Sequence, residues 1–495
     1  MNKQLKKARI GIYSTGLSTY WEQFEGLRER LIGYGQHIEK KVSQWADVYN
    51  FGLVDSVEKG REAGEYFNQH QVDIILLHVA TYSTSATILP IHQRCDAKVI
   101  ILNLQPTERV DYNQATTGEW LAYCGACPVP EFCNALSRAE IPYKVVSGLL
   151  GLEDVPNKSA EQEFSYKRPE AERAWKLIRE WVKAATVKAS LSDSRFGFLG
   201  NTYSGMLDLY SDFTMIQAQT GIHVEVLEMC DLDEELNNVT EDEIQHIRHE
   251  INNMFIISED SSTEQLAKKP SNEQLNWSAK VAAAQEKMIS SRHLSALTYY
   301  YHGNQNNHYE QLQSGFTVGH SLLTAQHVPC AGEGDLKTNI AMKICDILNV
   351  GGSFCEIVTT DYIDGTILFG HDGPFHLEIA EGKPILRGME LYHGKKGSGI
   401  AVEAKVKTGE VTMLGLTQSA NGKLKLIISE GISTDGPTMQ IGNTQTPVKF
   451  EITPDHYYEK WFAEAPTHHC AMSIGHNGKL MEKVGYLMDI ETVII

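Results

Sequence analysis

Side chains that could bind a divalent cation occur in the last third of the sequence. They are Glu333, Glu356, His371, His468 and His469. Glycines on both sides of Glu333 allow a tight turn and a close approach to a ligand. Carboxylates combined with imidazoles suit a hard or borderline divalent metal ion, so this set of residues indicates metal chemistry.

A helix expected directly after Glu333 would position this carboxylate. Asp335 is a suitable N-cap, and Ile340, Ile344 and Leu348 recur at helical spacing behind it. Taken alone, residue 333 would more simply be a glutamate exposed in a surface turn. The further carboxylate and the imidazoles downstream favour a functional site.

Apolar strands alternate with helices through the first two-thirds of the chain, with strands expected at 8–14, 72–80 and 97–104. This alternation predicts parallel sheets that are covered on both faces. Ligands bind such sheets beyond the carboxyl ends of the strands. On this basis the substrate-binding candidates are Tyr20, Gln105, Tyr203 and Met206. Each of them taken singly is more often a surface or capping residue.

The pattern changes after Gly351, where short strands are separated by Gly, Asn and Asp, and Asn421-Gly422 indicates a hairpin. We expect an antiparallel barrel or sandwich there. The predicted fold class is therefore α/β, with two consecutive Rossmann-like parallel-sheet domains and an antiparallel β-barrel-like C-terminal domain. The expected domains are 1–168, 169–350 and 351–495.

The composition and the net charge restrict the binding partners and the cellular compartment that we expect for this protein. The formal net charge of −19 argues against nucleic acid or an anionic membrane as the main partner. No apolar run is long enough to span a membrane. Nine cysteines, an odd number scattered through 495 residues, fit a reducing compartment. We expect a cytoplasmic protein.

Two motif blocks occur in order between about residues 315 and 371. AGEGD is followed by KT, and GGSFCE comes next; a His-His pair stands near the end of the chain. With these blocks the chain resembles the L-arabinose isomerase family, within the wider arabinose/fucose isomerase group, as a divergent member. The resemblance implies a small sugar substrate and a homo-oligomer, a trimer or hexamer with sites at subunit contacts.

The resemblance also implies the roles of individual residues. A divalent metal, most simply Mn²⁺ with Co²⁺ or Mg²⁺ as substitutes, would be held by Glu333, Glu356, His371 and His469. Glu333 and Glu356 would be the catalytic acid/base groups. His468 would lie beside the ligands, within reach of the substrate or as a hydrogen-bond donor.

The chemistry implied is aldose–ketose isomerisation, which moves a proton between C2 and C1 of an open-chain sugar through an enediol. A carboxylate can take this proton and return it. A divalent cation stabilises the negative charge that develops on the sugar oxygens.

Departures from the family pattern leave alternatives open. Asp361 competes with Glu356 as the second carboxylate, and His376 could replace His371. These changes predict a sugar substrate that can differ from L-arabinose.

Two other functions remain: a catalytically silent sugar-binding or regulatory relative, and a metal-dependent epimerase or lyase acting on a sugar acid. The last would need a cationic side chain such as Arg109 or Lys337.

Overall fold

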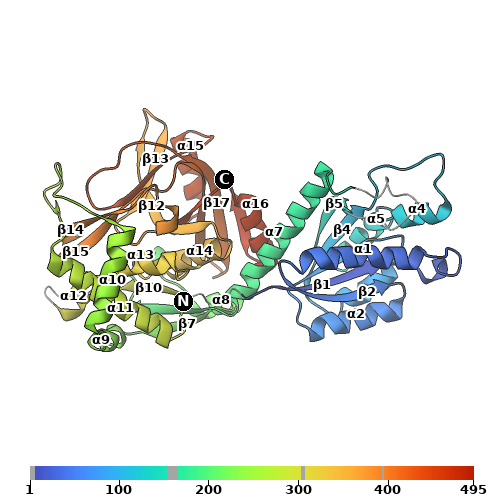
Figure 1. Ribbon diagram of the computed structural model, residues 1–495, viewed down its shortest axis with the longest axis horizontal. Coiled ribbons are helices and arrows are strands. Elements are labelled where there is room, and N and C mark those ends of the chain that lie inside the picture. Colours follow the sequence, from blue (N-terminus) through green and yellow to red (C-terminus); the bar gives the residue numbers. More distant parts are fainter. Residues whose placement is uncertain (1–5, 153–164, 303–306, 393–394) are drawn as a thin grey trace. The chain divides into compact units, whose positions relative to one another are not determined.

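A computed structural model describes residues 6–152, 165–302, 307–392 and 395–495 (Figure 1). The chain forms two compact units, Leu5–Ser190 and Leu191–Ile495. The second unit contains every candidate metal ligand. Within the described residues, no helix has the length and apolar character needed to cross a membrane.

The first unit is built on a five-stranded parallel sheet with the strand order β2-β1-β3-β4-β5. The strands are β1 (Arg9–Thr15), β2 (Asp47–Val54), β3 (Ile74–His78), β4 (Lys98–Gln105) and β5 (Tyr143–Leu149). The helices are α1 (Leu27–Val42), α2 (Val57–Gln69), α3 (Ser85–His92), α4 (Thr117–Tyr123), α5 (Val129–Arg138) and α7 (Pro169–Leu191), with the short 3-10 helix η1 (Ser18–Tyr20). Every residue of β3 is buried, as expected for a central strand between two helical layers.

Two buried histidines lie in this first unit. His78 Nδ1 lies 2.9 Å from Ser14 Oγ, and His92 Nε2 lies 3.0 Å from Tyr13 Oη. Burial lowers the pKa of each imidazole from 6.5 to about 3. Both side chains are therefore neutral in the folded protein at neutral pH.

The stability of the protein is expected to fall on acidification from pH 6.5. The unfolded chain then binds protons at His78 and His92, whereas the folded chain does so only near pH 3, which favours unfolding over this window. We expect His92→Gln to reduce the slope of unfolding free energy against pH by about 1.4 kcal/mol per pH unit. Urea denaturation at several pH values measures this slope. His223→Gln, at an exposed position, is the control; an equal change in both variants would contradict the prediction.

The second unit begins with a four-stranded parallel sheet of strand order β11-β10-β6-β7. Its strands are β6 (Arg195–Gly200), β7 (His223–Leu227), β10 (Ala296–Tyr300) and β11 (Cys330–Ala331). The helices of this part are η2 (Leu207–Leu209), α8 (Phe213–Thr220), α9 (Met229–Asn237), α10 (Glu241–Met254), α11 (Asn272–Ser291), α12 (His308–Gln313), α13 (Phe316–Ala325) and α14 (Leu336–Ile347). A core between sheet and helices includes Leu199, Leu297 and Phe316.

An antiparallel barrel follows in the same unit. Its six strands close in the order β16-β19-β12-β13-β18-β17, because β17 pairs back with β16. They are β12 (Gly351–Asp361), β13 (Thr366–His371), β16 (Gly409–Gln418), β17 (Leu424–Ser433), β18 (Thr444–Lys449) and β19 (His469–Ile474). Helix α14 packs on β12, β16 and β19. The candidate ligands on β12 and β19 therefore lie on strands that contact the helix following Glu333.

The remaining elements complete this unit. A smaller sheet joins β14 (Ile385–Tyr392) with β15 (Lys395–Glu403), β8 (Ile256–Ile257) and β9 (Ala267–Lys268). The chain ends with α15 (Pro454–Ala463), α16 (Gly478–Met488) and β20 (Glu491–Ile494). The hairpin indicated by Asn421-Gly422 joins β16 to β17, with Gly422 at a φ of +77°. The predicted fold class, with parallel α/β sheets followed by an antiparallel barrel, is confirmed.

Candidate metal centre

Glu333 lies in a tight turn between β11 and α14. Its φ is +61° and that of Gly334 is +70°, so two consecutive residues are left-handed. The carbonyl oxygen of Glu333 accepts a hydrogen bond from the Tyr203 N–H at 3.0 Å, and the Gly334 N–H donates to the Tyr299 carbonyl at 2.9 Å. These bonds hold Glu333 in a backbone conformation that costs about 1–3 kcal/mol for a residue other than glycine.

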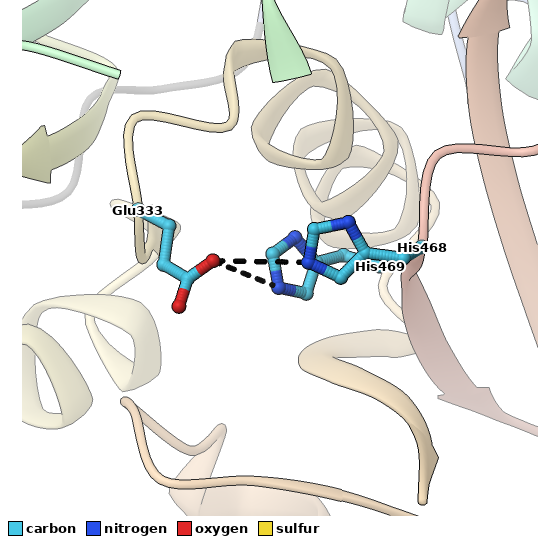
Figure 2. A group of neighbouring side chains, drawn as sticks. All are labelled: Glu333, His468 and His469. Carbon is cyan, nitrogen blue, oxygen red and sulfur yellow. Dashed lines mark ion pairs between the residues drawn. The ribbon is translucent and has the colours of Figure 1, made fainter. Parts of the chain in front are cut away.

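Three imidazoles face the Glu333 carboxylate, and Figure 2 shows two of them, His468 and His469. His468 Nε2 lies 3.7 Å and His469 Nε2 lies 3.6 Å from Glu333 Oε2. His371 Nε2 lies 3.9 Å from Oε1 of the same carboxylate. These separations exceed the length of a hydrogen bond. A cation between the imidazole nitrogens and the carboxylate would supply the interaction that is missing.

The other nitrogen of each imidazole lies beside a second carboxylate. The pairs are His371 Nδ1 with Asp372 Oδ1 at 2.8 Å, His468 Nδ1 with Asp208 Oδ2 at 2.7 Å, and His469 Nδ1 with Asp335 Oδ2 at 3.0 Å. Asp208 and Asp335 are hydrogen-bonded to Nδ1 of His468 and His469, so the Nε2 atom of each ring faces Glu333. This is the arrangement typical of metal-binding histidines. His371 Nδ1 lies close to Asp372 but forms no hydrogen bond among the described residues.

Three buried atoms of this group have no hydrogen-bond partner among the described residues: Glu333 Oε2, His469 Nε2 and His371 Nδ1, and the first two face each other. Buried polar atoms are seldom left unpaired, so this pair indicates a missing ligand. The ligand atoms of Glu333, His468 and His469 all lie within 4.8 Å of one another. The geometry and the donor types therefore fit a divalent cation such as Mn²⁺.

The protonation states of Glu333 and His469 suit cation binding, whereas His468 would have to lose a proton. Burial by itself would raise the pKa of Glu333, but His468, His469 and His371 hold this pKa below its ordinary value. Although burial opposes protonation of His468, Glu333 and Asp208 raise its pKa to about 9. Burial lowers the pKa of His469 in spite of Asp335. An ionised carboxylate and a neutral imidazole thus face each other at the position where a metal would bind.

The two candidates for the second carboxylate lie at different places on β12. Glu356 is directly opposite His469 of β19, so both side chains lie on the same face of the sheet. Glu356 also contributes to raising the pKa of His371 and of His468. Asp361 is five residues further along, about 17 Å for an extended strand. Its Oδ1 accepts the backbone N–H groups of Ile363 and Asp364 at 2.9 and 3.0 Å in the hairpin turn.

His376, the alternative to His371, is buried elsewhere. Its backbone N–H donates to Ser353 Oγ at 3.3 Å. Burial lowers its pKa, with Asp346 and Glu378 acting in the opposite direction. Asp346 is in the last turn of α14, whereas Glu333 precedes the first turn, so a helix of about 18 Å separates them. His371 is therefore the imidazole that lies with Glu333.

The four substrate-binding candidates belong to both units. Tyr203 and Met206 lie in the segment after β6. Tyr203 contacts the Glu333 backbone, and its ring lies tilted against that of Tyr300 with centroids 4.5 Å apart. Tyr20 ends η1 in the first unit. Gln105 ends β4 there, and its Nε2 donates to the Thr107 carbonyl at 2.7 Å. A substrate-binding role for these residues stays a prediction.

Lys337 and Arg109 are the two cationic side chains that were considered as binding partners for a sugar acid. Lys337 is 1% exposed and its Nζ donates to the carbonyls of Leu209 and Tyr210, both at 3.1 Å, and to Ser211 Oγ at 3.0 Å. The ammonium group is thus engaged within the protein. Arg109 is an exposed residue of the first unit.

The sequence reasoning missed the carboxylates that contact the imidazoles. Asp335 was recognisable only as a helix cap, a role that it does fill by accepting the Thr338 N–H at 2.9 Å. Asp372 directly follows His371, and this adjacency is the one available signal. Asp208 lies 260 residues from His468, and nothing in the sequence connects the two.

Comparisons with known proteins point to one family over part of the chain. Residues 211–351 match the family described as L-arabinose isomerase central domain. The match includes Glu333 and Asp335 but ends before Glu356 and the histidines of the site. It covers less than a third of the chain. A comparison with curated proteins returns no match.

Solved structures give only weak likenesses. A GDSL-like lipase from Bacteroides thetaiotaomicron is 10% identical over 37% of this chain and 88% of its own, with a TM-score of 0.21. A periplasmic solute-binding protein from Actinobacillus succinogenes with bound D-allose is 11% identical over 66% of this chain and 78% of its own, with a TM-score of 0.17. One from Agrobacterium vitis bound with alpha-D-tagatopyranose is 11% identical over 68% and 81%, with a TM-score of 0.15. Such scores support no statement about fold or function.

Proposed function

We propose that this protein is a metal-dependent aldose–ketose sugar isomerase, similar to L-arabinose isomerases and with a sugar specificity that can differ from theirs. The observation that carries the proposal is the Glu333 carboxylate facing three imidazoles, with Glu333 Oε2 and His469 Nε2 buried 3.6 Å apart and unpaired. The match of residues 211–351 to an isomerase domain family supports the same reaction class.

Glu333, His371 and His469 would hold the cation, together with Glu356 on the same sheet face as His469. Imidazole nitrogen and carboxylate oxygen suit Mn²⁺, with Co²⁺ or Mg²⁺ as substitutes. When bound, a divalent cation would stabilise the negative charge that develops on the sugar oxygens. Glu356 is the better second carboxylate, because Asp361 is engaged in the hairpin turn.

Glu333 and Glu356 would carry out the proton transfers. A carboxylate whose pKa lies below its ordinary value is ionised at neutral pH, so Glu333 can accept the proton from C2 of the open-chain sugar. The same group can return the proton to C1, which completes the change from aldose to ketose. Glu356 would serve the second transfer, between the two sugar oxygens. The turn around Glu333 holds its backbone in place while the proton moves.

Lys337, one of the two cationic side chains considered for a sugar acid, offers no free ammonium group. A carboxylate on the substrate would need a free cationic group. Lys337 is committed to three hydrogen bonds within the protein. The proposal also includes a homo-oligomer, as the resemblance implies. It further includes contacts to the substrate from Tyr20, Gln105, Tyr203, Met206 and His468.

The first experiment is a conversion assay with tetroses, pentoses, hexoses and deoxy sugars. It uses metal-stripped protein with and without added Mn²⁺, Co²⁺ or Mg²⁺. We expect ketose to form from at least one aldose only when a divalent cation is present, because the unpaired ligand atoms require one. Chelator should stop the reaction and a second addition of metal should restore it.

The possible results separate the candidate functions. Binding of Mn²⁺ and of a sugar without conversion would contradict the isomerase and indicate a catalytically silent relative. Conversion at the same rate in the presence of excess chelator would contradict the role of the metal. Turnover of sugar acids in place of aldoses would indicate an epimerase or a lyase.

A further inference from the structure

The segment that follows β6 places a carboxylate against His468. Asp208 lies in η2 (Leu207–Leu209), and its Oδ2 accepts two hydrogen bonds from the same residue. One comes from the backbone N–H of His468 at 3.0 Å and the other from its Nδ1 at 2.7 Å. These two bonds determine both the position of the His468 backbone and the direction of its ring.

The start of α14 anchors the same segment. Lys337 lies in the first turn of this helix, and its buried ammonium group donates to the carbonyls of Leu209 and Tyr210 and to Ser211 Oγ. Glu333 stands four residues before Lys337. The helix start that carries Glu333 therefore also holds the segment that carries Asp208.

His468 and His469 make corresponding contacts, although the pair of His468 and Asp208 is part-exposed and the pair of His469 and Asp335 is fully buried. Each presents Nε2 to Glu333 Oε2, at 3.7 and 3.6 Å, and each has Nδ1 against an aspartate, Asp208 or Asp335. An ionised carboxylate only accepts hydrogen bonds, so Nδ1 of both rings carries the proton. The Nε2 atoms of both rings are thus directed at the same oxygen of Glu333, at distances longer than a hydrogen bond.

We infer that Asp208 is a positioning residue which orients His468 as a further imidazole ligand of the cation held by Glu333. Asp208 fixes the ring so that Nε2 faces the cation, as Asp335 does for His469. This inference rests on the cation site of the proposed function and does not depend on which reaction the site performs.

The test compares Mn²⁺ binding to Asp208→Asn and to the wild-type protein. Asparagine keeps the shape of the side chain but is neutral, and its oxygen is a weaker acceptor for Nδ1–H. We expect Mn²⁺ to bind about 10- to 100-fold more weakly, the usual effect of losing an outer carboxylate. The electron paramagnetic resonance signal of free Mn²⁺ measures this affinity without any turnover.

Asp212→Asn is the matched control, because it removes a carboxylate from the same segment. Asp212 caps α8 by accepting the Met215 N–H at 3.0 Å and is the N-cap of that helix. Because asparagine caps a helix about as well as aspartate, Asp212→Asn should leave both the melting temperature and the Mn²⁺ affinity nearly unchanged. Asp208→Glu, which keeps the charge, should restore part of the affinity lost in Asp208→Asn, a rescue that a merely structural role would not require.

Each result supports or overturns the inference. Weaker Mn²⁺ binding in Asp208→Asn alone supports it, even if the wild-type protein converts no sugar and the proposed function fails. Equal Mn²⁺ affinity in Asp208→Asn and wild type overturns it, even if sugar conversion is observed. Equal weakening in Asp208→Asn and Asp212→Asn assigns the effect to the segment as a whole and also overturns it. Absence of Mn²⁺ binding to the wild-type protein overturns it together with the metal site.

Discussion

Glu333→Gln is expected to lower kcat/KM for aldose conversion by about 10³-fold or more. The substitution keeps the shape of the side chain but removes the group that accepts the proton, and the loss of a general base alone costs about 10²- to 10⁴-fold. It also removes the carboxylate that faces the three imidazoles, so Mn²⁺ should bind more weakly. The two losses act on the same reaction and we expect them to combine.

Steady-state kinetics at saturating Mn²⁺ separate the two contributions. Saturating metal compensates for weaker binding, so the loss that remains in kcat belongs to proton transfer. Glu459→Gln is the control, since Glu459 is an exposed residue on α15 of the same unit. Retention of more than about a tenth of wild-type kcat by Glu333→Gln would assign the base to another group, with Glu356 the next to test.

Gly334→Ala is expected to destabilise the second unit by about 3 kcal/mol and to abolish conversion. A methyl group at residue 334 would lie 2.4 Å from the Asn201 carbonyl oxygen and 2.7 Å from Thr202 Cα, both backbone atoms. The left-handed φ of +70° adds a cost of about 1 kcal/mol for alanine, and the overlap adds about 1–3 kcal/mol. Relief of the overlap must move Glu333, because the two residues are adjacent in one tight turn.

Gly365→Ala isolates the cost of the backbone conformation. Gly365 has a similar φ of +66° in the hairpin between β12 and β13, and no atom lies within 4 Å of the position of its Cβ. We therefore expect it to lose only about 1 kcal/mol and to keep full activity. Parallel urea denaturation of the two variants gives the difference. Equal destabilisation would show that the contact with Asn201 and Thr202 relaxes at no cost.

Much of the fold follows from local sequence patterns. The expected strand at 8–14 is β1, the strand at 72–80 contains β3, and the strand at 97–104 is β4 within one or two residues. Uninterrupted apolar strands between amphipathic helices predict buried parallel sheets, because both faces of such strands must be covered. Asn421-Gly422 indicates a hairpin on its own, since these residues favour the turn between two antiparallel strands.

The candidate site could be predicted only as a set of residue types. Glu333, His371 and His469 are recognisable from motif blocks and from residues that suit metals, and the structure places these three together. The choice between Glu356 and Asp361 depends on the register of β12 against β19. A shift of one residue along a strand moves each side chain to the opposite face of the sheet. Spacing along the chain contains no information about that register.

The sequence alone determined which segments form helices and strands and which residue types lie at the candidate metal centre. It could do so because periodicity and turn chemistry act over a few neighbouring residues. Only the tertiary structure decided which aspartate contacts His468 and which contacts His469. Asp208 reaches His468 across 260 residues and Asp335 reaches His469 across 134. Such pairs depend on how the segment after β6, the start of α14 and the edge of the barrel pack together. That packing is a property of the whole core, and no local stretch of the chain specifies it.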